Sequence, residues 1–478
     1  MNLLDGIKNN NTITNTKGSE YYQTTYNDNL DVFTMLTRYS SEETIISTFE
    51  KALIEDEDLA LANLLYILDI RNGKGERRIF KTIYKYLCSN YSNNALRILP
   101  FIIELGRFDY VLEGIDTKIE KETINLIKEQ LKIDLNSETP SLLAKWLPSH
   151  RTHKENKFLA KKLIKLLNMT EKEYRQTLSK LRNKINIVEK NLTNKTYDNI
   201  DFSKVPTKAM LKYNKSFNKN MKEKFTLYKE SLKKGDTKIN TAGLFSYEII
   251  KKILFQQAND NELIDLMWKN QKDILNGIDE NILVVADTSG SMTCFNYLPI
   301  TTSIGLAMYI AERNTGLFKN HFITFSEKPH LQELKGTTIT EKVKNIPRIN
   351  ALNTDIDKVF ELLLNISLEN KLTNEELPTK IIIISDMEFD RGIMSQTGTN
   401  FKGWKNTFEK AGYKLPTIIF WNVAGASKGL PVTKFDNDVA MVSGFSTNIL
   451  TNLLTLDKYT PTTVMLEKLT YYLNLLSN

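Results

Sequence analysis

One stretch decides the fold of the C-terminal part of this chain: Ile282-Leu283-Val284-Val285-Ala286-Asp287-Thr288-Ser289-Gly290-Ser291. Five apolar residues run directly into an aspartate and two serines. A short apolar run of this kind is typical of a strand buried on both faces. The Asp-x-Ser-x-Ser pattern therefore places one carboxylate and two hydroxyls together at the tip of a buried strand.

Downstream of this stretch, apolar runs of five or six residues alternate with amphipathic segments. The pattern predicts strands over 282–286, 321–325, 381–385, 417–421 and 439–442, and helices over 299–313, 355–366, 401–411 and 461–476. Alternation of strands and helices is typical of a parallel, doubly wound (Rossmann-like) sheet.

The N-terminal half has a different pattern, in which apolar residues recur at spacings of three and four. This spacing predicts helices from about residue 31 onward, with breaks at Gly73, Gly75 and Gly106. The segment Thr170-Glu171-Lys172-Glu173 has the signature of a capping box at a helix start. Short paired helices with tight turns favour an α-solenoid of HEAT-like repeats. The predicted fold class is α + α/β: a flexible arm over 1–30, an α-helical HEAT-like domain over 31–276 and an α/β domain over 277–478.

Composition narrows the class of protein. The 478 residues suffice for two or three domains. Cys88 and Cys294 lie far apart, so neither a disulfide framework nor a zinc site is expected. The apolar runs are shorter than a membrane span, and the N-terminus lacks the basic region of a signal peptide. We therefore expect a cytoplasmic protein that does not contact membranes.

Positive charge is concentrated in the middle of the chain. Residues 151–240 hold 24 lysines and arginines and nine acidic residues, a net charge of +15 in a chain whose total is +7. This asymmetry suggests a face that binds a polyanion. The alternative is a solvated surface of lysine-rich helices.

Three segments are expected to meet where the parallel strands end. Asp287, Ser289 and Ser291 follow one strand, Asp386 follows another, and Thr354 lies near the start of a helix. Carboxylate and hydroxyl oxygens suit Mg²⁺ or Mn²⁺. Six-coordinate Mg²⁺ would need water or an external carboxylate to complete this shell. Glu388 could also face the site, but we do not count it as a ligand.

This trio of segments resembles the metal-ion-dependent adhesion site (MIDAS) of von Willebrand factor A domains, over about residues 278–478. The resemblance implies that the hydroxyls of Ser289, Ser291 and Thr354 coordinate the metal directly. It implies that Asp287 and Asp386 bind largely through water, and that a partner's acidic group takes the remaining position.

A catalytic role is not expected for these residues. No histidine lies near Asp287 in the sequence, and His321 begins its strand at the opposite end. The Asp-x-Asp arrangement expected for aspartyl-phosphate chemistry is absent. We therefore predict that the protein is not an enzyme.

Two segments resemble the TROVE module of Ro ribonucleoproteins, which also joins a helical-repeat half to a von Willebrand A half. They are 69–77 (Asp-Ile-Arg-Asn-Gly-Lys-Gly-Glu-Arg) and 106–112 (Gly-Arg-Phe-Asp-Tyr-Val-Leu). The resemblance implies a ring of HEAT-like helices that binds RNA ends in its hole and small structured RNAs on a basic outer face. Residues 170–240 depart from that pattern.

A closer resemblance is to an uncharacterised family, known only as a domain of unknown function, that occurs in phages, bacteria, fungi and plants. Its hallmarks are similar to residues 141–149, 174–182, 188–189 and 202–210. This resemblance spans nearly the whole chain, and it implies a fold but little about function.

Basic residues of the helical half are candidates for binding nucleic acid. They are Arg71, Lys74, Arg77, Arg107, Lys180, Arg182, Lys184, Lys208 and Lys212. Alternatively, the arginines cap helix ends or pair with Asp69 and Asp109. Interleaved aromatic residues could stack on unpaired bases or pack the helices together; they are Tyr197, Phe202, Tyr213, Phe217, Phe225 and Tyr228.

The leading hypothesis is a non-catalytic, Ro-like RNA-binding protein with a metal-dependent site for a partner. The alternative is a metal-dependent scaffold that grips an acidic residue of another protein, and that could belong to a phage or virion.

Overall fold

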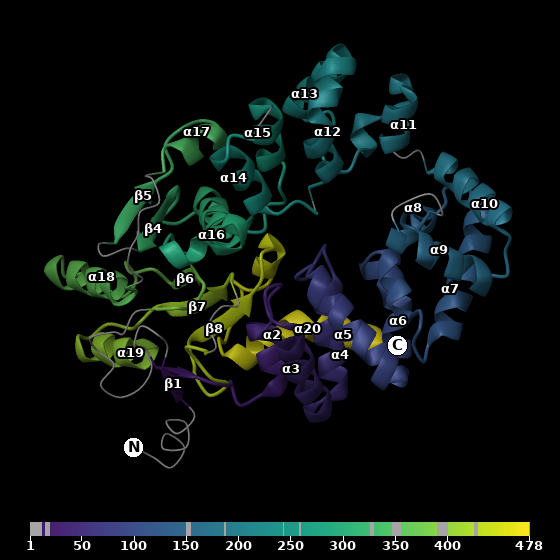
Figure 1. Ribbon diagram of the computed structural model, residues 1–478. Helices are drawn as coiled ribbons and strands as arrows, with labels where there is room; N and C mark the ends of the chain where they lie inside the picture. The colour runs from purple at the N-terminus through teal and green to yellow at the C-terminus, as the bar shows by residue number, and fades with distance from the viewer. Residues whose placement is uncertain are drawn as a thin grey trace. The chain divides into compact units, whose positions relative to one another are not determined.

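The computed structural model describes residues 12–14, 20–149, 154–185, 188–241, 243–257, 260–325, 329–346, 355–389, 400–424 and 429–477. The chain forms two compact units, and Figure 1 shows their helices and strands. Unit 1 is drawn from 1–67, 71–79 and 241–478, and unit 2 from 68–70 and 80–240. Packing thus joins the first helices of the chain to the C-terminal sheet, whereas the pattern of the sequence divides the chain near residue 276.

Unit 1 is built on a six-stranded sheet with the order β5-β4-β3-β6-β7-β8. All pairs are parallel except β4 with β5. The five predicted strands are present, and β5 is an additional edge strand. The strands are β3 (Ile282–Asp287), β4 (His321–Phe325), β5 (His330–Glu333), β6 (Lys380–Ser385), β7 (Thr417–Asn422) and β8 (Val439–Ser443).

Helices cover both faces of this sheet (Figure 1). On one face, Leu283 and Ile383 share a core with Phe360 of α18 (Asp357–Glu369) and Phe408 of α19 (Asn400–Lys410). On the other face, α16 (Cys294–Arg313) packs on β3, β4 and β6. This arrangement of a mostly parallel sheet between helices is compatible with a Rossmann-like domain.

The remaining helices of unit 1 surround the sheet. They are α2 (Asp28–Met35), α3 (Glu42–Glu55), α4 (Glu57–Leu68), α14 (Ser246–Leu254), α15 (Asn261–Lys269), α17 (Ile339–Lys344) and α20 (Pro461–Ser477). Close packing of α14 on α16 depends on Gly305, because a Cβ there would lie 3.1 Å from backbone atoms of Ser246 and Tyr247.

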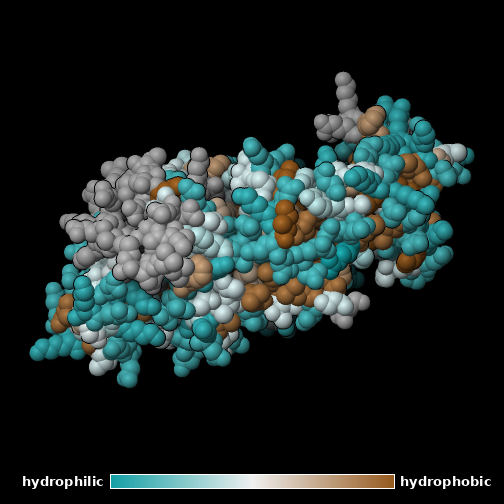
Figure 2. All heavy atoms as spheres, turned by 90° about the horizontal axis from the view of Figure 1, so that it is seen from below, coloured by the Kyte–Doolittle hydropathy of each residue, from teal (hydrophilic) through white to brown (hydrophobic). Residues whose placement is uncertain are grey.

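One stretch of unit 1 is long and apolar enough to cross a membrane. Among the described residues, Gly290–Arg313 passes this test of length and composition, and 78% of its most apolar window is buried inside the protein. The described surface in Figure 2 is mostly hydrophilic, with apolar residues between the polar ones.

The N-terminal residues that the structure describes are folded onto unit 1, in contrast to the flexible arm expected over 1–30. Strands β1 (Thr12–Thr14) and β2 (Glu20–Tyr22) pair antiparallel. Tyr21 enters the core of the sheet, and the backbone of Tyr22 exchanges hydrogen bonds with that of Leu430. Burying two aromatic rings in this way fixes the segment.

The turn that follows α4 is anchored to the end of the sheet by buried charge. The Lys74 ammonium is 1% exposed and donates hydrogen bonds to the carbonyl of Phe33 and to Oγ of Ser443 in β8. Arg38 forms a bidentate pair with Glu76, with N···O distances of 3.1 and 2.7 Å. These contacts tie the first helices of the chain to β8.

Unit 2 is helical throughout the residues that the structure describes, as predicted. Its helices are α5 (Arg77–Asn90), whose first residues belong to unit 1, then α6 (Ser92–Leu105), α7 (Glu120–Asn136), α8 (Leu143–Trp146), α9 (Lys154–Leu166), α10 (Glu171–Lys184), α11 (Val188–Asn194), α12 (Thr207–Asn220) and α13 (Lys222–Lys234). The predicted capping box is confirmed at the start of α10, where Thr170 and Glu173 satisfy each other's backbone N–H groups.

Aromatic residues form the core of the lysine-rich part of unit 2. Phe202, Phe217, Phe225 and Tyr228 are buried, and their ring centroids lie 4.8–6.5 Å apart in contacting pairs. These rings are therefore occupied in packing α12 against α13, and they offer no face for a base.

The central strand β6 gives a test of the core. Replacement of Ile383, which is 1% exposed, by alanine should lower the free energy of unfolding by about 2–5 kcal/mol. The matched control is Ile366→Ala, at a side chain that is 42% exposed, which should cost about 1 kcal/mol or less. Guanidinium unfolding followed by circular dichroism measures both, and equal losses would contradict this description of the core.

Candidate functional site

Two acidic side chains meet where neighbouring parallel strands end. In the register of β3 and β6, Ala286 lies opposite Ile384, so Asp287 comes beside Ser385 and Asp386 follows one residue later. Both carboxylates are buried, with Asp287 0% and Asp386 1% exposed. The predicted convergence of these two residues is therefore present in the structure.

Short hydrogen bonds hold the Asp287 carboxylate in place. Ser385 Oγ donates to Oδ2 of Asp287 over 2.6 Å, and the Ser289 N–H donates to Oδ1 over 2.9 Å. The hydroxyl oxygens of Ser289 and Ser291 lie 3.0 Å apart. One carboxylate, two hydroxyls and the neighbouring carboxylate of Asp386 thus form a small group of oxygen atoms, which we call the Asp287 centre.

The charge on the Asp287 centre is uncompensated. Burial, together with the negative charge of Asp386, raises the pKa of Asp287 to about 7, although hydrogen bonds from Ser385 and Ser289 oppose the shift. Among the described residues, neither carboxylate forms an ion pair with a lysine, arginine or histidine. Two buried like charges of this kind favour either a proton or a bound cation.

The donor set suits a hard divalent cation. Carboxylate and hydroxyl oxygens are ligands for Mg²⁺ and Mn²⁺. Within the part of the chain that the structure describes, no group of three His, Cys, Asp or Glu side chains could hold a metal by itself, so any ligation here must use the hydroxyls as well. Thr354, the remaining predicted ligand, lies outside the described residues.

Three further features of this region were not predicted from the sequence. The first is Ser385, whose hydroxyl donates to the carboxylate of Asp287. The signal in the sequence that could have identified it is a polar residue at the end of an apolar strand. Cys294 is half-buried, and its thiol pKa is raised by burial and by the charges of Asp386 and Glu388, so these groups lie close together. The third feature is the turn at Phe295, Asn296 and Tyr297.

This turn directly follows the serine loop and has left-handed backbone at three successive residues. Their φ angles are 51°, 57° and 62°, a conformation that costs Phe and Tyr about 1–3 kcal/mol each. The turn is held by Tyr39, whose ring stacks on Phe295 with centroids 3.6 Å apart, and by Lys251, which donates to the carbonyl of Asn296. Backbone strain of this kind is common near functional sites.

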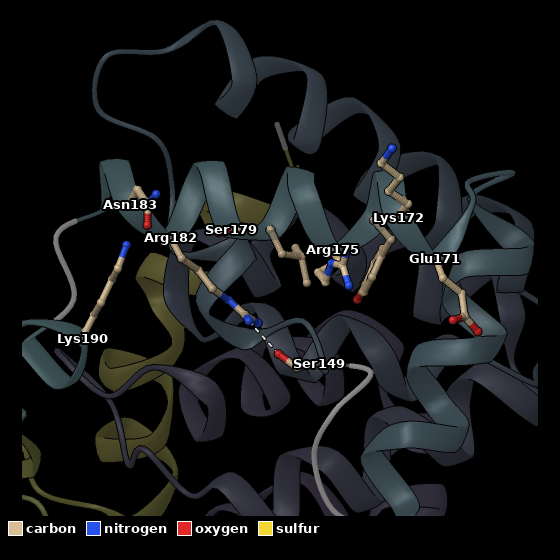
Figure 3. Close-up of a pocket in the computed structure, with 10 residues that line it drawn as sticks. Ser149, Glu171, Lys172, Arg175, Ser179, Arg182, Asn183 and Lys190 are labelled. Carbon is tan, nitrogen blue, oxygen red and sulfur yellow. Dashed lines mark hydrogen bonds between the residues drawn. The ribbon is translucent and has the colours of Figure 1, made fainter. Parts of the chain in front are cut away.

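Several basic residues predicted to bind nucleic acid have structural partners instead. Lys74 is buried in unit 1, where its ammonium is out of reach of a phosphate. The Arg107 guanidinium pairs with Asp109 over 2.8 Å and lies 3.6 Å from the centroid of the Trp146 ring. Arg182 is half-buried and donates to the carbonyls of Ala144 and Leu147 and to Oγ of Ser149. Figure 3 shows the bond to Ser149.

The other predicted residues are exposed. Arg71 and Arg77 lie near the turn before α5, and Lys180 and Lys184 lie on α10. Lys184 donates to the carbonyl of Ser137 over 2.9 Å. On α12, the exposed residues Lys208 and Lys212 share a helix face because they are four residues apart.

Comparison with known proteins gives the family. Residues 281–468 match a family described as "Domain of unknown function (DUF7788)", and residues 121–281 match "Domain of unknown function (DUF2828)". The chain is also 30% identical over 499 residues to "Uncharacterized protein L728" of Acanthamoeba polyphaga mimivirus, a match that spans 95% of this chain and 86% of the viral protein. This chain belongs to the family of that viral protein.

The two matched regions correspond to different parts of the structure. The DUF7788 region contains β3 to β8 and the Asp287 centre, and the DUF2828 region runs from α7 to the residue before β3. The expected resemblance to a family of unknown function is thereby confirmed, whereas the resemblance to Ro ribonucleoproteins stays a prediction.

The raised pKa of Asp287 predicts a pH dependence of stability in the presence of a chelator. Between the ordinary value of 3.8 and about 7, the unfolded chain releases this proton while the folded chain keeps it. The free energy of unfolding should therefore fall as the pH rises through this range, and Asp287→Asn should remove that part of the slope.

Thermal unfolding of the wild type and the variant across this pH range measures the difference between their slopes. The control is Asp438→Asn, at an exposed acid paired with Lys405, which should keep the wild-type slope in this range. If Asp287→Asn also keeps the wild-type slope, the carboxylate does not titrate as described.

Proposed function

We propose that this protein is a non-catalytic binding protein whose Asp287 centre holds Mg²⁺ or Mn²⁺ and uses it to grip an acidic group of a partner. The observation that carries the proposal is the pair of buried carboxylates, Asp287 and Asp386, that meet beside two serine hydroxyls without an ion-pair partner among the described residues. A divalent cation would neutralise the two charges where burial makes them costly.

The ligands follow from the chemistry of the oxygens. Ser289 and Ser291 would coordinate through their hydroxyls, and Asp287 and Asp386 largely through water, with Thr354 added by the resemblance to von Willebrand A domains. Since Mg²⁺ binds six oxygens, the shell would leave a position for a carboxylate from outside the chain. When bound, the cation would act as a Lewis acid that attracts this carboxylate.

The proposal includes an architecture and a location. The sheet of unit 1 would be a doubly wound domain of the von Willebrand A type, and the helical unit would be HEAT-like, as in Ro ribonucleoproteins. The protein would work in the cytoplasm without contacting a membrane. Its relationship to a viral protein supports the narrower possibility of a phage or virion component.

RNA is the second candidate ligand, and the lysine-rich surface of unit 2 supports it. Lys180 on α10 and Lys208 and Lys212 on α12 are exposed, in the segment that carries a net charge of +15. Exposed lysines of this kind contact phosphates through charge and have no need of base stacking. RNA recognition would then depend mainly on phosphates, because Phe217 of α12 and Phe225 and Tyr228 of α13 are buried in the core, while Tyr213 of α12 is half-buried.

Cation binding tests the first proposal. Mg²⁺ or Mn²⁺ should bind the wild-type protein in isothermal titration calorimetry, and a concentration about 100 times the Kd should stabilise it by about 2.7 kcal/mol. Asp287→Asn should abolish both effects, because it removes one of the two buried charges. Asp438→Asn, the same chemical change at an exposed acid of unit 1, should retain both. Binding that survives Asp287→Asn would place the cation elsewhere.

Salt-dependent RNA binding tests the second proposal. A fluorescein-labelled oligoadenylate should bind more weakly as the salt concentration rises. Replacing Lys208 and Lys212 by glutamate should make the slope of log K against log salt concentration less steep by about 1.4. The matched control reverses two exposed lysines of unit 1, Lys344 and Lys414. An affinity that does not change with salt, or equal losses in both double variants, would argue against this surface.

A further inference from the structure

Unit 2 contains a pocket that the functions above do not use. It has a volume of ≈ 540 Å³ and lies between α10, Ser149 and Lys190 of α11 (Figure 3). This volume lies in the range of small-ligand sites in proteins. The pocket is therefore large enough for one nucleotide.

The charge of the lining is strongly positive. Among the described residues, four basic side chains line the pocket against one acid, Glu171; they are Lys172, Arg175, Arg182 and Lys190. Three of the four come from α10, so a single helix sets most of the charge. A cavity lined by one sign of charge concentrates ligands of the opposite sign.

Arg182 contributes a positive charge that its neighbours do not cancel. Its guanidinium donates to the carbonyls of Ala144 and Leu147 over 2.7 and 2.8 Å, and to Oγ of Ser149 over 2.6 Å. All three acceptors are neutral, and no carboxylate of the described residues accepts from it. Burial lowers the pKa of Arg182, but a guanidinium stays protonated at neutral pH. A half-buried cation without a counterion favours an anion in the adjacent space.

Arg175 and Lys190 are placed to contact such an anion directly. Neither forms a hydrogen bond or ion pair with another side chain in the part of the chain that the structure describes. An arginine with all its donors available can bind two phosphate oxygens at once. These two residues are therefore the expected phosphate contacts. Arg182 adds positive electrostatic potential and forms part of the pocket wall.

The rest of the described lining is mixed, with Tyr174 and Leu178 beside the polar residues Ser149, Ser179 and Asn183. Tyr174 and Leu178 project from α10 on the same face, four residues apart. The Tyr174 hydroxyl donates to the carbonyl of Pro148 over 2.9 Å, which fixes the ring. Because Tyr174 and Leu178 are 1% and 3% exposed, they close the wall of the pocket, and the basic groups are the part of the lining that can recognise a ligand.

We infer that this pocket binds a phosphate-bearing ligand, with the phosphate held by the basic side chains of the lining, among which Arg175 and Lys190 have charges that the described chain does not use. The same chemistry is offered by a free mononucleotide and by an unpaired nucleotide of an RNA. The second source rests on the RNA-binding proposal above, and the first does not. Adenosine monophosphate and an oligoadenylate are the probes that separate them.

The test compares charge reversal in the pocket with the same charge reversal outside it. The double variant Arg175→Glu/Lys190→Glu should bind adenosine monophosphate about tenfold or more weakly than the wild type in isothermal titration calorimetry. The control Lys344→Glu/Lys414→Glu makes the same number of charge reversals at two exposed lysines of unit 1 that do not line the pocket, and it should leave this affinity unchanged. Adenosine, which lacks the phosphate, should compete far more weakly than adenosine monophosphate.

The outcomes separate the pocket from the RNA proposal. If adenosine monophosphate binds the wild type and displaces the labelled oligoadenylate, the pocket holds a nucleotide of the RNA. If adenosine monophosphate binds but the protein retains no RNA, the pocket is a site for free nucleotides and the RNA proposal fails. If it does not bind, selective loss of oligoadenylate in the double variant still supports the pocket. Equal effects of Arg175→Glu/Lys190→Glu and of the control Lys344→Glu/Lys414→Glu on both probes would overturn the pocket.

Discussion

The parallel pairing of β3 with β6 is the constraint on which the rest of unit 1 depends. Five successive residues of each strand are paired, from Ile282 with Lys380 to Ala286 with Ile384. Because the strands run the same way, their carboxyl ends fall at one edge, and Asp287 and Asp386 must share it. A slip of one residue would move Leu283 and Val285 to the other face of the sheet, away from Phe360 and Phe408, so the packing of these side chains fixes the position of the acids.

Much of this arrangement could be predicted from the sequence because the strands are apolar on both faces. Five strands were found from their runs alone, but β5 was not, since His330-Leu331-Gln332-Glu333 lies at the edge and has mostly polar residues. The folding of α2 to α4 with the sheet could not be predicted, because it depends on contacts such as that between Lys74 and Ser443, which are 369 residues apart.

The basic residues show the limit of arguments from charge. Lys74 and Lys208 are both lysines that the sequence suggested for phosphate binding. Lys74, in a glycine-rich segment, is buried and donates to the carbonyl of Phe33, whereas Lys208, in a lysine-rich segment, is exposed. Burial lowers the pKa of Lys74 to about 7, although the nearby Glu76 opposes the shift. Composition identifies which segments are basic. Whether a given basic residue is buried in the fold or exposed on the surface depends on tertiary packing. The same holds for the aromatic residues: Phe202, Phe217, Phe225 and Tyr228 are buried, whereas Tyr197 and Tyr213 are half-buried.

The Asp287 centre and the α10 pocket follow the same physical rule with opposite signs. In each, burial removes water from a charge, and hydrogen bonds from the chain orient the charged group without neutralising it. Ser385 and the Ser289 N–H do this for Asp287, and the carbonyls of Ala144 and Leu147 accept from Arg182 in the same way. A charge that served only the fold would be less costly if it were paired within the chain. Its oriented but unpaired state at both places is what favours a ligand from outside, a cation at one and an anion at the other.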